Sequence, residues 1–142
     1  MIFFNKSVYL VDLLEGITDI HNHLLPAMDD GSPNLETTME MIKAMKAIGV
    51  KNAIATPHTM EDYYNNDAAN ITADFQETKL ALATTDAKGF ILSTASEYMM
   101  DGQFDQIIEK SNYLCLHKNY LLTELSYFQR PDQLEELVFK MC

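Results

Sequence analysis

The chain has 142 residues, which is enough for one domain with a sizeable hydrophobic core. Its formal net charge is −11 with a single arginine, which argues against proteins that bind nucleic acid or anionic membrane through a basic surface. The two cysteines do not form a disulfide framework, and no arginine follows either one, which excludes a cysteine-nucleophile phosphatase loop. No stretch has transmembrane length and the N-terminus lacks a signal-peptide layout, so we expect a cytoplasmic protein without membrane insertion.

Apolar runs bounded by turn residues predict four strands, at residues 17–23, 50–56, 90–96 and 120–125. Apolar residues at helical spacing predict helices from Ser32 to Gly49, from Ile71 to Ala83, around Phe104–Ile108, and from about Asp132 onward. The first of these helices is expected to have Ser32 as N-cap, Pro33 as first residue and Gly49 as C-cap. We expect a loop at 59–69 and a short extended piece at 113–116. The alternation predicts an α/β fold of parallel strands with crossover helices.

Residues 18–31 bring two histidines and two carboxylates into one short unit. Residues i and i+2 of a strand point to the same face, so His21 and His23 can offer their imidazoles to one metal ion. Asp29 and Asp30 follow in a loop bounded by proline and glycine, which can fold back over the strand end. Imidazole and carboxylate ligands together suit zinc, manganese or iron.

Three later apolar runs lead into further potential ligands, namely His58, Glu97 and Glu124. They fall at or near the ends of successive predicted strands, which is where an α/β barrel places its active site. A carboxylate against an apolar strand needs a partner when it is buried, which favours Glu97 as a ligand. Glu124 stays open between a ligand, a group that supports the ligands, and a paired structural acid.

The motifs resemble those of the PHP (polymerase and histidinol phosphatase) superfamily, and most closely those of the bacterial tyrosine phosphatases of capsule and exopolysaccharide biosynthesis. The resemblance spans residues 18–127 and rests on five segments in the family's order: 18–23, 28–31, 55–58, 95–98 and 122–127. We expect residues 1–16 to be an N-terminal extension that packs on the domain or on an adjoining chain. The resemblance implies that 17–142 form the N-terminal, four-strand part of a distorted (β/α)7 PHP barrel.

The resemblance also implies a site and a reaction. His21 and His23 would ligate one metal ion, Asp30 and His58 a neighbouring one, and Glu97 would bridge two ions. Glu124 matches another acidic site residue, whereas Asp29 is expected to hold the loop through an Asx turn. The implied cofactor is manganese or another divalent metal, with up to three ions in a complete family member. Metal-activated water would hydrolyse phosphotyrosine on the partner tyrosine kinase that controls polysaccharide export.

The sequence departs from the family after Glu124, because it lacks the later histidine with an adjacent arginine and the Asp-x-His motif. A closed (β/α)8 barrel usually takes roughly 250 residues, and four strands do not close one. We expect a truncated form of a full enzyme, because the ligand motifs present are intact. The alternatives are assembly with a second polypeptide or as a homo-oligomer, and a non-catalytic remnant.

Three other functions stay open from the sequence. One is another phosphoesterase of the same superfamily, such as a histidinol-phosphatase-like enzyme. Another is an amidohydrolase-type barrel, which also begins with His-x-His but generally bridges its metals with lysine, whereas Glu97 has that position here. The third is a non-enzymatic interaction module. We expect His117 to be an exposed turn residue, and Tyr63 and Tyr64 to be exposed in their loop or to line a substrate mouth.

Overall fold

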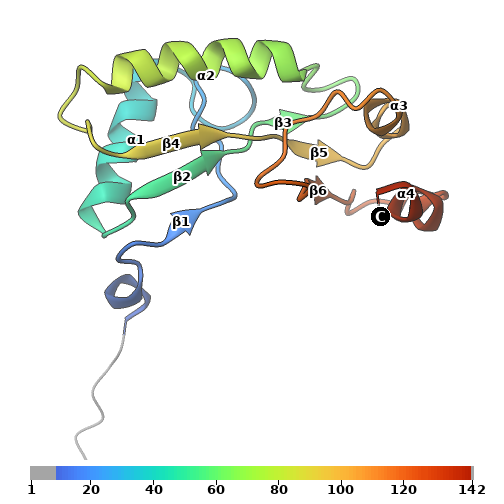
Figure 1. Cartoon of the computed structure of the whole chain (residues 1–142), viewed down its shortest axis with the longest axis horizontal. Helices are drawn as coiled ribbons and strands as arrows, with labels where there is room; N and C mark the ends of the chain where they lie inside the picture. The colour runs from blue at the N-terminus through green and yellow to red at the C-terminus, as the bar shows by residue number, and fades with distance from the viewer. Residues whose placement is uncertain (1–8, 142) are drawn as a thin grey trace, which may run out of the picture.

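The structure is a computed structural model that describes residues 9–141, and this part of the chain is α/β with parallel strands. The strands are β1 (Thr18–Asp19), β2 (Asn52–Ala55), β3 (His58–Thr59), β4 (Ile91–Thr94), β5 (Glu97–Met99) and β6 (Leu122–Glu124). The helices are η1 (a 3-10 helix, Leu10–Leu13), α1 (Leu35–Ala47), α2 (Ala68–Leu82), α3 (Phe104–Glu109) and α4 (Leu134–Met141). The predicted crossover helices are confirmed, because α1, α2 and α3 each join parallel strands (Figure 1).

The strands form two parallel sheets of three, with the orders β1-β2-β4 and β3-β5-β6. The expectation of four continuous strands is therefore wrong in number. The expected second strand at 50–56 corresponds to β2, and β3 is an additional short strand beyond Pro57, which has no N–H to donate to a sheet and lies between the two. Pairing still continues across the break, since the Ala95 N–H donates to the Ala55 carbonyl and the Glu97 N–H to that of Pro57. The two chain segments therefore stay adjacent, as β2 beside β4 in the first sheet and as β3 beside β5 in the second.

The first and last expected strands are shorter than predicted. β1 ends at Asp19, yet Asn22 still pairs with the next segment, because the Thr56 N–H donates to its carbonyl at 2.8 Å. β6 begins at Leu122 rather than at residue 120. No strand is assigned within residues 113–116 of the described chain, because the pairing there is limited to a bridge between His117 and Tyr120.

Helix α1 begins two residues later than predicted, because Asn34 and not Ser32 is its N-cap. The Asn34 side chain accepts a hydrogen bond from the Thr37 N–H at 2.9 Å. The Ser32 hydroxyl is instead buried beside that of Thr38, at 2.8 Å, and is not available to cap the helix. The C-cap is Ile48 and not the predicted Gly49, which is the next residue and has a φ of +96°, a conformation that glycine adopts without strain.

Helix α2 begins three residues earlier than predicted, at Ala68. Its N-cap is Asp67, whose carboxylate accepts hydrogen bonds from the N–H groups of Ala69 and Asn70. The first turn is polar or small, so apolar spacing could not locate it. The expected loop at 59–69 also contains the end of β3 and a bridge between Met60 and Tyr64. At the other end of the chain, α4 begins at Leu134 rather than near Asp132.

Each sheet has its own hydrophobic core. The first core lies between the sheet β1-β2-β4 and the helices α1 and α2, with Leu24, Leu25, Ile42 and Ile71 fully buried. In the second core, Tyr98, Met100, Phe104 and Leu137 pack between the sheet β3-β5-β6 and the helices α3 and α4. Figure 1 shows these elements near the C-terminus. The segments that pass from one sheet to the other carry the candidate site.

Within the described residues, β1 and β6 are each paired along one side only. Ile17 and Ile20 are exposed beside β1, and Leu125 and Tyr127 beside β6. No helix in residues 9–141 combines the length and apolar character that a membrane crossing requires. Residues 1–8 of the expected N-terminal extension lie outside the described residues, and η1 buries none of its side chains.

Candidate metal centre

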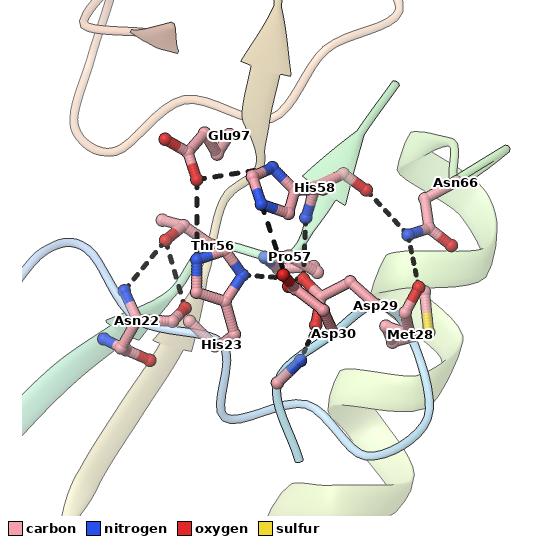
Figure 2. Close-up of polar contacts among 12 residues, drawn as sticks. Asn22, His23, Met28, Asp29, Asp30, Thr56, Pro57, His58, Asn66 and Glu97 are labelled. Carbon is pink, nitrogen blue, oxygen red and sulfur yellow. Dashed lines mark hydrogen bonds and ion pairs between the residues drawn. The ribbon is translucent and has the colours of Figure 1, made fainter. Parts of the chain in front are cut away.

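The structure brings together all six residues that the sequence analysis named as metal ligands. They lie where the chain passes from the first sheet to the second, on the segments that follow β1, β2 and β4 and at the end of β6. Figure 2 labels four of them, His23, Asp30, His58 and Glu97. His21 and His23 follow β1, His58 opens β3, Glu97 opens β5, Glu124 ends β6, and Asp30 lies in the loop before α1. Parallel pairing explains the convergence, because β3 and β5 place His58 directly beside Glu97.

Glu97 is the centre of the site. One of its oxygens, Oε2, lies 3.1 Å from His21 Nε2, 3.5 Å from His23 Nε2 and 3.5 Å from His58 Nδ1. The Glu97 side chain is only 5% exposed, so this carboxylate is shielded from water. A buried carboxylate needs compensating positive charge, which protonated imidazoles or a metal ion would supply.

His58 connects Glu97 to the two remaining acidic residues. Its Nε2 lies 3.9 Å from Asp30 Oδ1, and its Nδ1 lies 3.7 Å from Glu124 Oε2. Within the described residues, His58 Nδ1 is buried and makes no hydrogen bond. A buried imidazole nitrogen without a partner, between two carboxylates, is in the environment of a metal ligand.

The ligand atoms form three groups, within each of which all atoms lie within 4.8 Å of one another. The groups are His21–His23–Glu97, His23–Asp30–His58, and His58–Glu97–Glu124. His23, His58 and Glu97 each belong to two groups, whereas His21, Asp30 and Glu124 each belong to one. Imidazoles mixed with carboxylates are a donor set that divalent transition metals accept, so the residues fit the metal that the sequence motifs imply.

Asp29 lies behind the ligands and supports them. Its Oδ2 is 2.7 Å from His23 Nδ1 and accepts a hydrogen bond from the His58 N–H at 2.9 Å, while its Oδ1 accepts one from the Gly31 N–H at 2.9 Å. The last of these is the predicted Asx turn, and the contacts with His23 and His58 were not predicted.

This contact changes the pKa values of both partners in the metal-free chain. The hydrogen bond to Asp29 raises the pKa of His23 above its ordinary 6.5, against the opposing effect of burial. Burial favours a higher pKa for Asp29, but the hydrogen bonds from His23, His58 and Gly31 outweigh it and lower the pKa below the ordinary 3.8. Both shifts favour an imidazolium–carboxylate pair.

Two further residues at the site were not predicted to have these contacts. Asn66 donates from Nδ2 to the carbonyls of His58, at 2.7 Å, and Met28, at 2.9 Å (Figure 2). The Tyr64 ring stacks on the His58 imidazole, with centroids 5.5 Å apart and an angle of 10° between the rings. Tyr63 is exposed as expected, but Tyr64 is not, because the bridge to Met60 turns it toward the site. No local sequence pattern identifies these contacts, since both residues lie in a loop.

Asn22, which lies between His21 and His23, is held by hydrogen bonds to the segment that contains Ile54 and Thr56. The Asn22 N–H donates to the Thr56 hydroxyl at 3.1 Å, and Asn22 Nδ2 donates to the Ile54 carbonyl at 3.0 Å. These bonds hold His21 and His23 beside the segment that leads to His58. The Asp19 carboxylate accepts a hydrogen bond from the His21 backbone N–H at 3.0 Å.

Comparisons with known proteins identify the family of this chain. The family described as "Capsular polysaccharide synthesis, CpsB/CapC" matches residues 17–142. The chain is 31% identical over 124 residues to tyrosine-protein phosphatase YwqE of Bacillus subtilis, covering 87% of this chain and 48% of YwqE. It is 26% identical over 128 residues to CapC of Staphylococcus aureus, covering 88% of this chain and 49% of CapC.

A solved structure gives the same result for the fold. It comes from a study of YwqE and of CpsB from Streptococcus pneumoniae, described as unique metal-dependent tyrosine phosphatases. The TM-score is 0.78 at 28% identity, over 88% of this chain and 51% of that one. The chain thus spans about half the length of the relatives that it matches. With its family match over residues 17–142, the chain belongs to the CpsB/CapC family of capsular polysaccharide synthesis.

Proposed function

We propose that this chain carries the larger part of the metal site of a metal-dependent protein-tyrosine phosphatase that acts in capsular or exopolysaccharide biosynthesis. The observation that carries the proposal is the convergence of three histidines and three carboxylates around Glu97 Oε2. The names of the similar proteins, tyrosine-protein phosphatase YwqE and the metal-dependent phosphatases of the solved structure, supply the reaction.

In this proposal, His21, His23, Asp30, His58, Glu97 and Glu124 hold divalent ions, with manganese as the expected metal. When bound, such ions lower the pKa of coordinated water and neutralise charge on phosphoryl oxygens. Glu97 presents a carboxylate to two of the three ligand groups and is therefore the bridging residue. Asp29 and Asn66 keep His23 and the His58 backbone in place while the substrate enters.

For the fold, we propose that residues 17–142 are the N-terminal part of a PHP barrel, with residues 1–16 as an extension. The strand order supports this. Within each sheet the strands lie side by side in the order in which they occur in the chain, β1-β2-β4 and β3-β5-β6, as barrel strands do. For the substrate, we propose phosphotyrosine on a cytoplasmic tyrosine kinase of polysaccharide export. Further strands of a barrel could pair with the edges of β1 and β6 that are free within the described residues.

A second candidate is a non-catalytic metal-binding chain, for which the three ligand groups alone would suffice. The experiment that separates the two is hydrolysis of a phosphotyrosine peptide by the purified chain with added Mn²⁺, beside metal content by elemental analysis. Histidinol phosphate serves as the substrate of the alternative PHP phosphoesterase.

Turnover of the peptide that is lost in His21→Ala and His23→Ala, but kept in Asp86→Asn, would support the phosphatase. Asp86 is a suitable control because it is exposed and belongs to none of the three ligand groups. Preference for histidinol phosphate would favour the other phosphoesterase. Stoichiometric metal without turnover of either substrate would favour the non-catalytic chain, and absence of bound metal would contradict both metal-binding proposals.

A further inference from the structure

We propose that Asp29 is the positioning residue of this metal centre, because it fixes the tautomer of His23 and holds the backbone of His58. The inference rests on the proposed function in one respect, namely that the positioned histidines bind a metal. It goes beyond that function by assigning a role to a carboxylate that belongs to none of the three ligand groups.

The first step is the contact between Asp29 and His23. An ionised carboxylate only accepts hydrogen bonds, so the 2.7 Å contact between Asp29 Oδ2 and His23 Nδ1 places a proton on Nδ1. In the neutral ring, Nε2 then carries a lone pair, which faces Glu97 Oε2 at 3.5 Å. Two acceptors that face each other need a cation between them, so this tautomer directs His23 Nε2 at the metal position.

The second step is the reach of the same carboxylate. Asp29 Oδ2 also accepts from the His58 N–H, and Oδ1 accepts from the Gly31 N–H, both at 2.9 Å. The Asp29 side chain is fully buried, and with three donors its oxygens are held in one orientation. One side chain therefore links His23, the turn at Gly31 and the start of β3, which come from three separate segments.

The third step is the fit of the loop around His23. A Cβ on Gly31 would overlap both the Cβ and the carbonyl oxygen of His23, so only glycine allows this approach. The Ser32 N–H then donates to the His23 carbonyl at 3.1 Å. The loop thus encloses the backbone of His23 while Asp29 holds its ring.

Asn66 completes the connection on the other side of His58. It donates to the His58 carbonyl, whereas Asp29 accepts from the His58 N–H, so both backbone groups of this residue are held. It also donates to the carbonyl of Met28, which precedes Asp29. Figure 2 shows Asp29 and Asn66 on either side of the His58 backbone.

A merely structural role for Asp29 makes a different prediction from a positioning role. In Asp29→Asn the side-chain oxygen can still accept from a backbone N–H, so the loop keeps part of its support. The new amide group, however, can present an N–H to His23 Nδ1, which then favours the tautomer protonated at Nε2. That tautomer has no lone pair at Nε2 and cannot bind the metal there.

The test combines ¹⁵N NMR of the imidazoles with metal titration. The spectra are recorded on metal-free chain at a pH where the ¹⁵N titration shows that the His23 ring is neutral. We expect Nδ1–H for His23 in the wild type and a shift toward Nε2–H in Asp29→Asn. The exposed His117 is an internal reference that does not change. By calorimetry, Mn²⁺ affinity falls about 10- to 100-fold in Asp29→Asn, which is typical when a partner of a metal-binding histidine is lost.

Asn66→Ala is the second variant, because it loosens His58 and Met28 without touching His23. We expect it to weaken Mn²⁺ binding while the His23 tautomer stays as in the wild type. Asp86→Asn should leave tautomer and affinity unchanged, and circular dichroism checks the fold of each variant.

A wild-type His23 protonated at Nε2 would overturn the inference, even if every variant failed to fold. An Asp29→Asn chain with wild-type tautomer and wild-type affinity would overturn it as well. If the wild type shows the Nδ1–H tautomer and Asp29→Asn loses it, but neither chain binds metal, the tautomer assignment is upheld and the proposed function is refuted.

Discussion

Replacing Glu97 by glutamine tests the central feature of the site, which is that one carboxylate is shared by two ligand groups. The substitution keeps the size of the side chain and removes its negative charge. Since Glu97 belongs to the groups with His21–His23 and with His58–Glu124, metal binding in both should weaken. His21→Ala is the matched variant, because His21 belongs to only one group.

The size of the effect follows from charge and burial. Two unit charges 4 Å apart in a partly buried site interact by about 4 kcal/mol, and every 1.4 kcal/mol is about tenfold in affinity. The Glu97 side chain is 5% exposed, so solvent screens this interaction little. We therefore expect Glu97→Gln to lower the affinity for Mn²⁺ by about a thousandfold at the ions that it contacts.

The assay is calorimetric titration with Mn²⁺, with the number of bound ions checked by elemental analysis after gel filtration. Glu97→Gln should lose more ions than His21→Ala, and Asp86→Asn should match the wild type. Equal losses in Glu97→Gln and His21→Ala would show that the carboxylate does not bridge. A Glu97→Gln chain with wild-type affinity and ion number would refute the reasoning altogether.

Three other predictions concern the support of the site and the second core. Gly31→Ala should displace the loop from His23, lower the free energy of unfolding by about 1–3 kcal/mol, as overpacking typically does, and weaken Mn²⁺ binding. An unchanged free energy of unfolding and unchanged Mn²⁺ affinity would contradict the close approach of Gly31 to His23. The Asp29–His23 pair should stabilise the metal-free chain most between pH 3.8 and 6.5. Because the pKa of Asp29 is lowered, the stabilisation is lost as the pH falls through the folded-state pKa of Asp29. Because the pKa of His23 is raised, the stabilisation is also lost as the pH rises through the folded-state pKa of His23. Urea unfolding across pH should show the largest difference between wild type and Asp29→Asn in that window, and a flat difference would exclude the pair. Tyr98→Phe should cost about 1–3 kcal/mol in urea unfolding, because the Leu114 N–H loses the phenol oxygen that accepts from it at 2.7 Å; an unchanged midpoint would contradict this.

The convergence of the predicted ligands could be inferred from the sequence because it depends on a general property of parallel sheets. Residues that follow successive parallel strands lie at the same edge, so His21, His58 and Glu97 had to be near one another once the strands were recognised. The α/β alternation and the glycine that ends α1, Gly49, were predictable for a similar reason, since each rests on a local pattern.

The details that the sequence did not reveal depend on contacts between distant segments. Asn66 lies in a polar loop, and its bonds to His58 and Met28 require the folded arrangement of three segments. The short strands β3 and β5 were also missed, because the predicted strands end at residues 56 and 96, just before each of them begins. The N-cap of α1 was predicted at Ser32 because serine followed by proline is a common helix start. In the structure the buried Ser32 hydroxyl contacts the Thr38 hydroxyl instead, and Asn34 caps the helix.

Burial within the site separates the shared ligands from the others. The side chains that belong to two groups are 5% exposed for Glu97, 14% for His58 and 23% for His23. Those that belong to one group are 36% exposed for Glu124, 55% for His21 and 65% for Asp30. The shared residues therefore form the protected floor of the site, and the others form a rim that is open to solvent.

A floor of this kind has a chemical consequence for the proposed phosphatase. Catalytic metal sites keep coordination positions free for water and substrate, whereas structural sites are closed by protein ligands. Each of the three ligand groups combines one rim residue with two floor residues, so water and a phosphoryl group would reach a bound ion from the side of His21, Asp30 or Glu124 without displacing the buried Glu97. We predict that a chelator removes Mn²⁺ faster from His58→Ala than from Asp30→Ala, because His58 belongs to two groups and Asp30 to one. Equal rates of removal from the two variants would show that the two classes of ligand do not act separately.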